Sequence, residues 1–329
     1  MLFAPFAAIS TFNIRFRLVR VRYYLVDISV ILATYKRSEI LDKTLQSFCS
    51  LETDGLEWEV LVVDNAGDLD TRKTVHRYQQ HLPLKYLVEI TAGKNNALNH
   101  AVKKARGDLF VITDDDILAT PSWLIEMWQG AQRWPEYSMF GGRILPKFPE
   151  GKIPISVDDN FIKSAYVIAD WDIKEGPYEA RYIWGPNMAV RAEIFHSGWS
   201  FNPDIGPNGK NYVMGSETEF NKRLEKAGFK SVYLPNSLVY HQIRPEQLTV
   251  NWLYGRAFRE GRRQAYQQRL HEVRMLFGVP KHLFRPLITV GIKRALYFFN
   301  RKTALQLGIL HWRFWGMVYQ CRQQLSCEN

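Results

Sequence analysis

Two hydrophobic patterns alternate along residues 28–116. Short apolar runs rich in β-branched residues are typical of strands buried on both faces. They occupy residues 28–33, 58–64, 84–89 and 108–114. Between them, apolar residues recur every three or four positions, as on one face of a helix. These stretches are 38–49, 69–80 and 96–105. Strands and helices that alternate at this spacing predict parallel βαβ units and an α/β fold.

The pattern is weaker after residue 116. A helix is predicted over 121–134, because Pro121 suits the first turn of a helix. The run 137–144 is typical of an edge strand. A second ordered block then combines a loop, a helix and a strand, predicted at 202–211, 215–229 and 231–241.

Charge is distributed unevenly along the 329-residue chain, whose formal net charge is +10. From Arg256 onward, 14 Lys and Arg residues stand against 3 acidic residues. Residues 1–255 carry 29 basic and 30 acidic groups. Hydrophobic residues make up 46% of the chain and charged residues 23%, as in an ordinary folded globule. The sequence therefore predicts a nearly neutral body followed by a strongly basic C-terminal region.

The region after residue 245 interleaves aromatic residues, such as Tyr297, Phe299 and Trp312, with Lys and Arg. Basic residues interrupt each apolar run before it reaches the roughly 18 residues that a spanning helix needs. This composition favours helices that lie in the membrane interface and contact anionic headgroups. An alternative is a helical lid whose arginines bind a nucleotide diphosphate. No nucleic-acid-binding fold accompanies the charge, so we expect no nucleic-acid partner.

The cysteines and the N-terminal residues indicate in which cellular compartment the protein is expected. Cys49, Cys321 and Cys327 have spacings that suit neither a disulfide framework nor a zinc site, which favours a reducing compartment. The N-terminal stretch places its apolar residues before its arginines, the reverse of a secretory signal. We therefore expect a cytoplasmic protein, held peripherally on the inner face of the cell membrane.

Polar or acidic residues end three of the predicted strands, at Thr34, at Asp64 and at 114–116. In open α/β sheets the ligand crevice lies outside the carboxyl ends of the strands, so these side chains are expected to converge there. A strand-terminal Asp can instead simply cap the helix that follows it.

The strongest chemical signal is the sequence TDDDI at 113–117. Three adjacent carboxylates stay ionised together only when a cation or many donors neutralise them. Asp114 and Asp116 would point to the same side of an extended chain and could hold Mg²⁺ or Mn²⁺ against a diphosphate. The alternative is a solvated acidic turn.

Five segments, in order, carry a resemblance to a known family. They read ISVILATYKR, WEVLVVDNAG, AGKNNALNHAVKKARGDLFVITDDD, WGPNMAVRAEIF and GSETEFNKRLEKAGF. Together they resemble the inverting family-2 glycosyltransferases of the GT-A fold, over roughly residues 27–245. The resemblance implies a mixed, mostly parallel Rossmann-like sheet flanked by helices. It divides the chain into a basic extension, a nucleotide-binding half, an acceptor half and a helical extension, at 1–26, 27–116, 117–245 and 246–329.

The resemblance also implies roles for individual residues. Asp116 would bind the metal, with His241 completing its shell, and Asp64 would accept a hydrogen bond from uracil, which favours a UDP-sugar. The other residues implied to bind the nucleotide sugar are Ala33, Thr34, Tyr35, Lys94, Asn95, Asn99, Asp114 and Asp115. The segment implied to face the acceptor contains Trp184, Gly185 and Asn187.

Glu217 stands where the family carries its catalytic base. The usual Glu-Asp pair reads Ser216-Glu217 here, which leaves Glu217 and Glu219 as candidates. On a helix these two side chains point about 200° apart, so only one of them can face the cleft. The motif position favours Glu217, and the alternative is an acid that merely stabilises the helix N-terminus.

The sequence thus predicts a metal-dependent, inverting glycosyltransferase that uses Mn²⁺ or Mg²⁺ and a glycan or lipid-linked acceptor. The Gln-x-x-Arg-Trp motif of processive relatives is missing, which favours single addition. Two alternatives are a sugar nucleotidyltransferase and an inactive, membrane-associated scaffold. The first would want a glycine-rich loop after the first strand, where the chain reads ATYKRSE.

Overall fold

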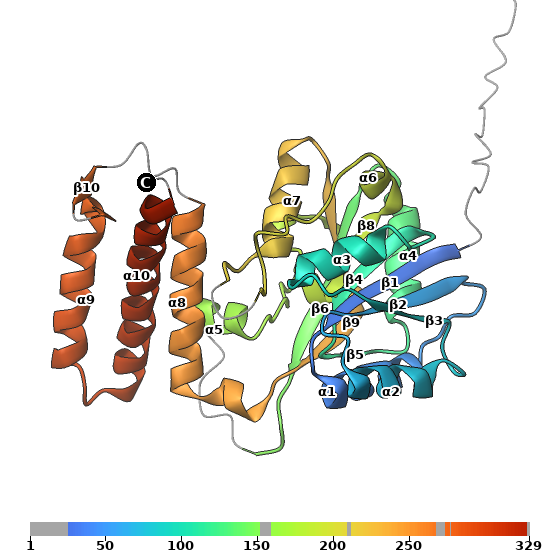
Figure 1. Cartoon of the computed structure of the whole chain (residues 1–329), viewed down its shortest axis with the longest axis horizontal. Helices are drawn as coiled ribbons and strands as arrows, with labels where there is room; N and C mark the ends of the chain where they lie inside the picture. Colours follow the sequence, from blue (N-terminus) through green and yellow to red (C-terminus); the bar gives the residue numbers. More distant parts are fainter. Residues whose placement is uncertain (1–25, 152–158, 209–211, 268–273, 277, 328–329) are drawn as a thin grey trace, which may run out of the picture.

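The computed structural model describes residues 26–151, 159–208, 212–267, 274–276 and 278–327 (Figure 1). The predicted N-terminal extension lies outside this range, except for Val26. Within the described residues, nine strands form one mixed sheet in the order β3-β2-β1-β4-β8-β6-β9-β5, with β7 paired to β9. The sheet and its flanking helices confirm the predicted fold class.

The first half of the sheet is parallel, as predicted. Its strands are β1 (Val26–Thr34), β2 (Trp58–Asp64), β3 (Leu84–Val88) and β4 (Gly107–Asp114). The helices between them are α1 (Ser38–Phe48), α2 (Leu69–Tyr78) and α3 (Lys94–Val102). Thr34 pairs with Asp64, and Ala33 pairs with Asp114, so these polar strand ends lie at one edge of the sheet.

The second half of the sheet mixes strand directions. It contains β5 (Ile117–Ala119), β6 (Met139–Lys147), β7 (Gly176–Pro177), β8 (Met188–Arg191) and β9 (Ser231–Gln242). β6 lies between β8 and β9, so the prediction of an edge strand at 137–144 is wrong. Both sides of β6 are hydrogen-bonded because the chain returns twice to the sheet after this strand.

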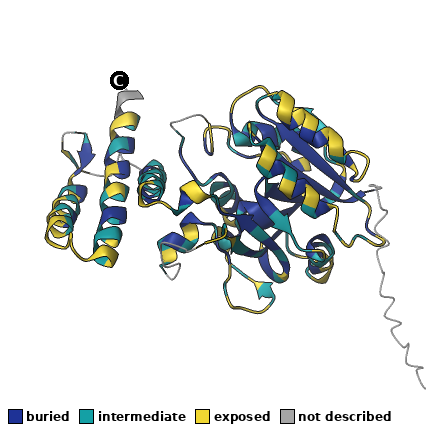
Figure 2. Ribbon diagram, turned by 90° about the horizontal axis from the view of Figure 1, so that it is seen from below, coloured by how far each residue is buried: buried dark blue, intermediate teal, exposed yellow. Residues whose placement is uncertain are grey.

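The strands of the sheet are largely buried (Figure 2), and apolar side chains cover both of its faces. Ile28, Val30 and Leu32 of β1 pack with α1, α2 and α4 (Trp123–Arg133) on one face. Ile31 of β1 packs on the other face, with α3, α6 (Ala192–His196) and α7 (Ser216–Lys226). This alternation explains the continuous apolar runs in the sequence, since strands covered on both faces have no polar side.

The C-terminal region forms helices beside this domain, as predicted (Figure 1). They are α8 (Val250–Tyr266), α9 (Phe284–Leu296) and α10 (Arg301–Cys327). A short ribbon of β10 (Met275–Leu276) and β11 (Val279–Pro280) precedes α9, and α5 (Asn160–Ala165) packs near α8. No helix in the described part of the chain is both long and apolar enough to cross a membrane.

Candidate active site

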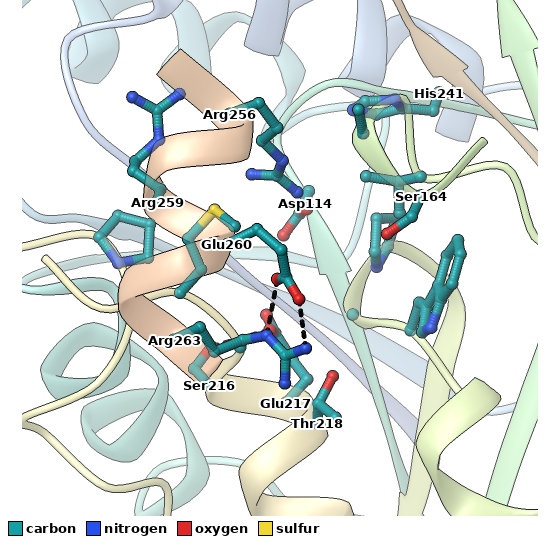
Figure 3. Close-up of a pocket in the computed structure, with 18 of the residues that line it drawn as sticks. Asp114, Ser164, Ser216, Glu217, Thr218, His241, Arg256, Arg259, Glu260 and Arg263 are labelled. Atoms are coloured by element: carbon teal, nitrogen blue, oxygen red, sulfur yellow. Dashed lines mark hydrogen bonds and ion pairs between the residues drawn. The ribbon is translucent and has the colours of Figure 1, made fainter. Parts of the chain in front are cut away.

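A cavity of about 610 Å³ opens at the carboxyl end of β4. Its walls come from β4, from the segment before β8, from the N-terminus of α7, from the end of β9 and from α8 (Figure 3). Seven of the predicted site residues line it: Lys94, Asp114, Asp116, Trp184, Gly185, Glu217 and His241. The fold therefore brings together side chains that are distant in the sequence, such as Lys94 and His241, which are 147 positions apart.

Asp116 is the most strongly paired acid of the turn after β4. Arg37 contacts Asp116 Oδ2 through Nη2 at 2.5 Å and Asp115 Oδ1 through Nη1 at 2.9 Å. Arg244 Nη1 lies 3.3 Å from Asp116 Oδ2. Burial by itself would raise the pKa of Asp116, but His241 and Arg37 lower the pKa further than burial raises it. The Asp116 carboxylate is therefore ionised at neutral pH.

The donor set at Asp116 fits a divalent cation. Asp116 Oδ1 is buried without a hydrogen-bond donor and lies 3.4 Å from His241 Nε2. His241 Nδ1 contacts the carbonyl oxygen of Tyr166 at 2.9 Å, which orients Nε2 toward the carboxylate. In the described residues no three His, Cys, Asp or Glu side chains form a metal-binding group. Mg²⁺ and similar ions accept such sparse protein ligation when substrate phosphates and water complete the shell.

Glu217 lies across the cavity from this turn, in the first turn of α7. Lys94 Nζ bridges the two sides, at 2.5 Å from both Glu217 Oε1 and Asp114 Oδ1. The Ser216 hydroxyl donates to Glu217 Oε2 at 2.8 Å. Burial would raise the pKa of Glu217, but Lys94 and these hydrogen bonds lower it below its ordinary value. Glu217 is therefore a carboxylate that can accept a proton.

Two glycines shape the surroundings of Glu217. Gly215 precedes α7 with φ of 94°, a left-handed conformation that favours glycine. A Cβ on Gly185 would lie 2.5 Å from Glu217 Oε1, so the Glu217 side chain packs directly on the backbone of Gly185. The predicted acceptor segment and the predicted base are thus in contact.

Glu219 is engaged elsewhere, because its Oε1 accepts from Arg223 Nε at 2.6 Å. Glu219 is not among the residues that line the cavity in the described structure. Of the two acids that the sequence left open, the fold brings only Glu217 to the cavity.

The three asparagines among the predicted site residues form hydrogen bonds to the backbone of neighbouring segments. The Asn95 amide donates to the carbonyl oxygens of Asn202 and Ile205, and Asn99 exchanges two hydrogen bonds with the backbone of Phe201. Asn187 is fully buried, donates to the Arg143 and Ser237 carbonyls and accepts from the Trp123 indole. These side chains support the cavity walls but do not line the cavity.

Asp64 is buried, and four donors occupy its carboxylate. The backbone amides of Ala66 and Gly67 donate to Oδ1, and the amide of Asp68 and the Tyr86 hydroxyl donate to Oδ2. Since a carboxylate offers about four acceptor positions, this set saturates it. A contact between Asp64 and uracil stays a prediction that requires one of these donors to leave.

The remaining predicted residues lie just outside the cavity. The Thr34 hydroxyl donates to Asp115 Oδ2 at 2.7 Å, which ties the end of β1 to the acidic turn. Asp115 is 3% exposed and is also paired with Arg37, so it supports the turn from behind. Ala33 is the last but one residue of β1, whereas Tyr35 follows the strand and is 56% exposed, so a ligand can reach it from solvent.

The sequence did not single out any of the site's arginines individually, although the lid alternative places arginines of the C-terminal region at a diphosphate. Arg37 and Arg244 contact Asp116, and Arg256, Arg259 and Arg263 line the cavity from α8. The last three are spaced by three and four positions, which puts them on one face of a helix. That spacing was visible in the sequence, but we read the basic residues of this region as a membrane-facing surface or as a lid over a diphosphate.

The nucleotide-binding type of sheet, the acidic turn at its carboxyl edge and the carboxylate across the cavity define a glycosyltransferase of the GT-A fold. The chain belongs to glycosyl transferase family 2, whose family model matches residues 29–198. It is therefore a glycosyltransferase, which rejects the nucleotidyltransferase alternative.

The individual relatives share less than a quarter of their aligned residues with this chain. The chain is 22% identical over 247 residues to a glucosyl-dolichyl phosphate glucuronosyltransferase of Haloferax volcanii, covering 72% of this chain and 75% of that protein. It is 24% identical over 229 residues to a Methanococcus voltae dolichyl N-acetyl-glucosaminyl phosphate glucuronosyltransferase that transfers a diacetamido sugar, covering 64% of each.

Solved structures share the fold across nearly the whole chain. The Pyrobaculum calidifontis mannosyltransferase PcManGT, in complex with GDP-Man and Mn²⁺, superposes with a TM-score of 0.60 at 16% identity and 90% coverage of both chains. Residues 1–349 of S. aureus TarS, in complex with UDP-GlcNAc, superpose with a TM-score of 0.53 at 14% identity, covering 92% of this chain and 93% of TarS 1–349.

Proposed function

We propose that this protein transfers one sugar from a UDP-sugar to a hydroxyl of a sugar already linked to a lipid phosphate, with inversion at the anomeric carbon. The acceptor class is supported by the two archaeal relatives, whose names specify glycosyl-dolichyl phosphate acceptors. The donor class rests on the resemblance, which implies a contact of Asp64 with uracil; structures of the same fold hold either UDP-GlcNAc or GDP-Man. The observation that carries the proposal is the position of Glu217, which faces the turn of Asp114 and Asp116 across one cavity.

The residues divide the reaction between two sides of the cavity. The nucleotide diphosphate lies at the acidic turn, and the acceptor hydroxyl lies at Glu217, beside Trp184 and Gly185. The acceptor oxygen forms a bond to the anomeric carbon while the bond from that carbon to the diphosphate oxygen breaks. Glu217 takes the hydroxyl proton. Attack from the face opposite the leaving group inverts the configuration.

A divalent cation, held by Asp116 and His241, would neutralise the charge of the diphosphate. Lys94 lies between the acidic turn and Glu217, so it is placed to contact the diphosphate when the donor is bound. Arg37 and Arg244 keep Asp116 ionised and oriented.

We also propose that the protein associates peripherally with the cytoplasmic face of the membrane. A lipid-linked acceptor requires access to the bilayer surface. The exposed apolar residues of α9 and the basic residues around them supply a surface of the right chemistry.

The test uses purified protein, Mn²⁺, a panel of UDP-sugars and glucosyl farnesyl phosphate as the acceptor. We expect product with one UDP-sugar. Glu217→Gln should reduce kcat by about 10²–10⁴-fold, the usual contribution of a general base. UDP affinity should change by less than about twofold, because Glu217 lies on the acceptor side.

Glu219→Gln is the matched control, since it changes the same side chain type on the same helix and leaves the cavity lining intact. It should transfer at the wild-type rate. A Glu217→Gln variant as active as the wild type would contradict the assignment of the base. Transfer only from GDP-sugars would contradict the donor class.

A further inference from the structure

Helix α8 presents a basic face to the cavity. Trp252, Arg256, Arg259 and Arg263 recur at spacings of four, three and four positions, and all of them line the cavity. The opposite face of α8, with Leu253, Ala257 and Ala265, is buried. Figure 3 shows Arg256, Glu260 and Arg263 extending from α8 toward Glu217 and Asp114. The residues that line the cavity include seven Lys and Arg but only four Asp and Glu.

These arginines differ in their pairing. Arg263 donates two hydrogen bonds to Glu260, at 2.6 and 2.7 Å, and is neutralised there. Arg256 and Arg259 form no ion pair with any carboxylate of the described residues. Arg259 Nε is buried without a hydrogen-bond acceptor, and its guanidinium lies 6.0 Å from the Tyr212 ring centre. Burial lowers the pKa of Arg256, which shows that its charge is poorly solvated. A poorly solvated cation without a counter-charge favours the binding of an anion.

Arg256 and Arg259 come from a different element than the arginines of the acidic turn. The acidic turn already has its own arginines, since Arg37 and Arg244 contact Asp116. The titratable groups that act on Arg256 are, in decreasing order, Tyr212, Arg259, Glu260 and Glu217. Arg256 therefore lies near Glu217, where the proposed mechanism places the acceptor, and Figure 3 shows that it also extends toward Asp114, whereas Arg259 extends away from both.

The position of α8 is fixed by tight packing on α10. A Cβ on Gly261 would overlap the Arg313 carbonyl oxygen, and a Cβ on Gly316 would overlap the Phe258 carbonyl oxygen. The two helix backbones thus touch at glycines on both sides. Rigid support of this kind allows a pair of arginines to select a ligand by position as well as by charge.

We infer that Arg256 and Arg259 form the binding site for the phosphate of the acceptor, the group that links the acceptor sugar to its lipid. The inference rests on the proposed function, because only a lipid phosphate-linked acceptor would bring such a phosphate to Arg256 and Arg259. Guanidinium groups suit this ligand because they donate paired hydrogen bonds to phosphate oxygens. With the phosphate held at α8, the sugar attached to it would extend into the cavity toward Glu217.

The experiment measures two affinities by calorimetry. The first is the affinity of geranyl phosphate for the full-length enzyme saturated with UDP and Mn²⁺, with geraniol as the phosphate-free probe. The second is the affinity of UDP itself. The variants are Arg256→Gln, Arg259→Gln and the double variant. Arg322→Gln is the matched control, because it removes an exposed arginine of α10 that is not among the cavity-lining residues.

We expect the double variant to weaken geranyl phosphate binding by about tenfold or more, since two charge-assisted contacts are lost. UDP and geraniol affinities should stay within about twofold, and a double Lys variant should recover part of the loss. Equal weakening of UDP would overturn the inference and assign the arginines to the donor. Unchanged geranyl phosphate binding would also overturn it.

A failure of the proposed function would look different. If the protein bound no UDP, the geranyl phosphate titration would still be performed on the enzyme without nucleotide. Arginine-dependent binding of geranyl phosphate would then support the phosphate site independently of the donor assignment. Loss of fold is monitored by circular dichroism, and the single variants replace the double one if it unfolds.

Discussion

At the residue scale, Lys94 is the group that connects the two sides of the cavity. Its ammonium contacts Asp114 and Glu217 at once. Burial disfavours its charge, but the two carboxylates raise the pKa of Lys94 well above its ordinary value. Lys94 is therefore a permanent cation, and the basicity of Glu217 depends on it.

Lys94→Met should shift the pH dependence of sugar transfer. In the wild type, Lys94 and nearby hydrogen bonds lower the pKa of Glu217, so the base stays ionised as pH falls below neutrality. Without the ammonium, the remaining effect of burial raises that pKa. The acid limb of the kcat/KM profile should therefore move to higher pH in Lys94→Met and stay near the wild-type position in Lys94→Arg. Identical acid limbs in Lys94→Met and wild type would contradict this dependence.

Residue roles were only partly predictable from the sequence. The resemblance predicted that Asp116, His241 and Glu217 would lie at one site; the fold brings all three to the cavity, and their roles stay predictions. The roles of Asn187 and Asp64 could not be predicted, because they depend on partners that the sequence does not place nearby. Asn187, for example, bonds to Trp123, Arg143 and Ser237. A polar side chain in a family motif can support the site from within the core.

At the scale of elements, the contact of α8 with α10 determines the shape of the cavity. Gly261 and Gly316 place the backbones of the two helices in direct contact. A third glycine, Gly308, lies against the Tyr254 ring, so larger residues at these positions would push the helices apart.

Gly316→Ala should destabilise the protein by about 1–3 kcal/mol, the usual cost of overpacking, because its methyl group meets a backbone carbonyl that cannot move aside. Gly291→Ala is the matched control in α9, where a Cβ meets nothing within 4 Å. It should stabilise the helix by about 0.5–1 kcal/mol. Urea unfolding measures both effects. If the two variants had equal stability, the two helix backbones would not be in contact.

Elements were predicted well where the hydrophobic period was strong. The helices and strands of the first sheet half begin and end within a few residues of their predicted positions, because each strand is covered on both faces. The run 137–144 looked like an edge strand because its glycines gave it little apolar character. Those glycines instead allow close packing, since a Cβ on Gly142 would meet Asn187 and one on Gly141 would meet Ile183.

At the scale of the molecule, the basic C-terminal region divides into two parts with different surroundings. Arginines of α8 face the cavity, whereas α9 and the turn after it expose apolar residues to solvent. Ile288, Ile292 and Leu296 follow one another at spacings of four, and Phe299 is 95% exposed. The exposed basic residues around them are Arg285, Lys293, Arg301 and Lys302. We call these apolar and basic residues the α9 surface.

Replacing Ile292, Leu296 and Phe299 by Ser should abolish cosedimentation with vesicles of phosphatidylglycerol and phosphatidylcholine. Each large apolar side chain contributes about 1.5–3 kcal/mol when fully buried, so three of them dominate the interaction. High salt should weaken wild-type binding, since each Lys or Arg near an anionic surface adds about 1 kcal/mol.

Leu69→Ser is the matched control for this surface, because it removes an apolar residue that is 69% exposed at the start of α2, on the catalytic domain. It should bind vesicles as the wild type does. Transfer to a water-soluble acceptor should be equal in all three proteins. A triple variant that still pelleted with the vesicles would remove the α9 surface from the proposal.

The dependence of α8 on α10 has a consequence for the order in which the enzyme becomes competent during its synthesis. The strands β1 to β4 are complete by Asp114, whereas α8 packs most extensively on α10, which begins at Arg301. In a nascent chain, the wall of the cavity that α8 forms would therefore lack this packing until α10 had left the ribosome.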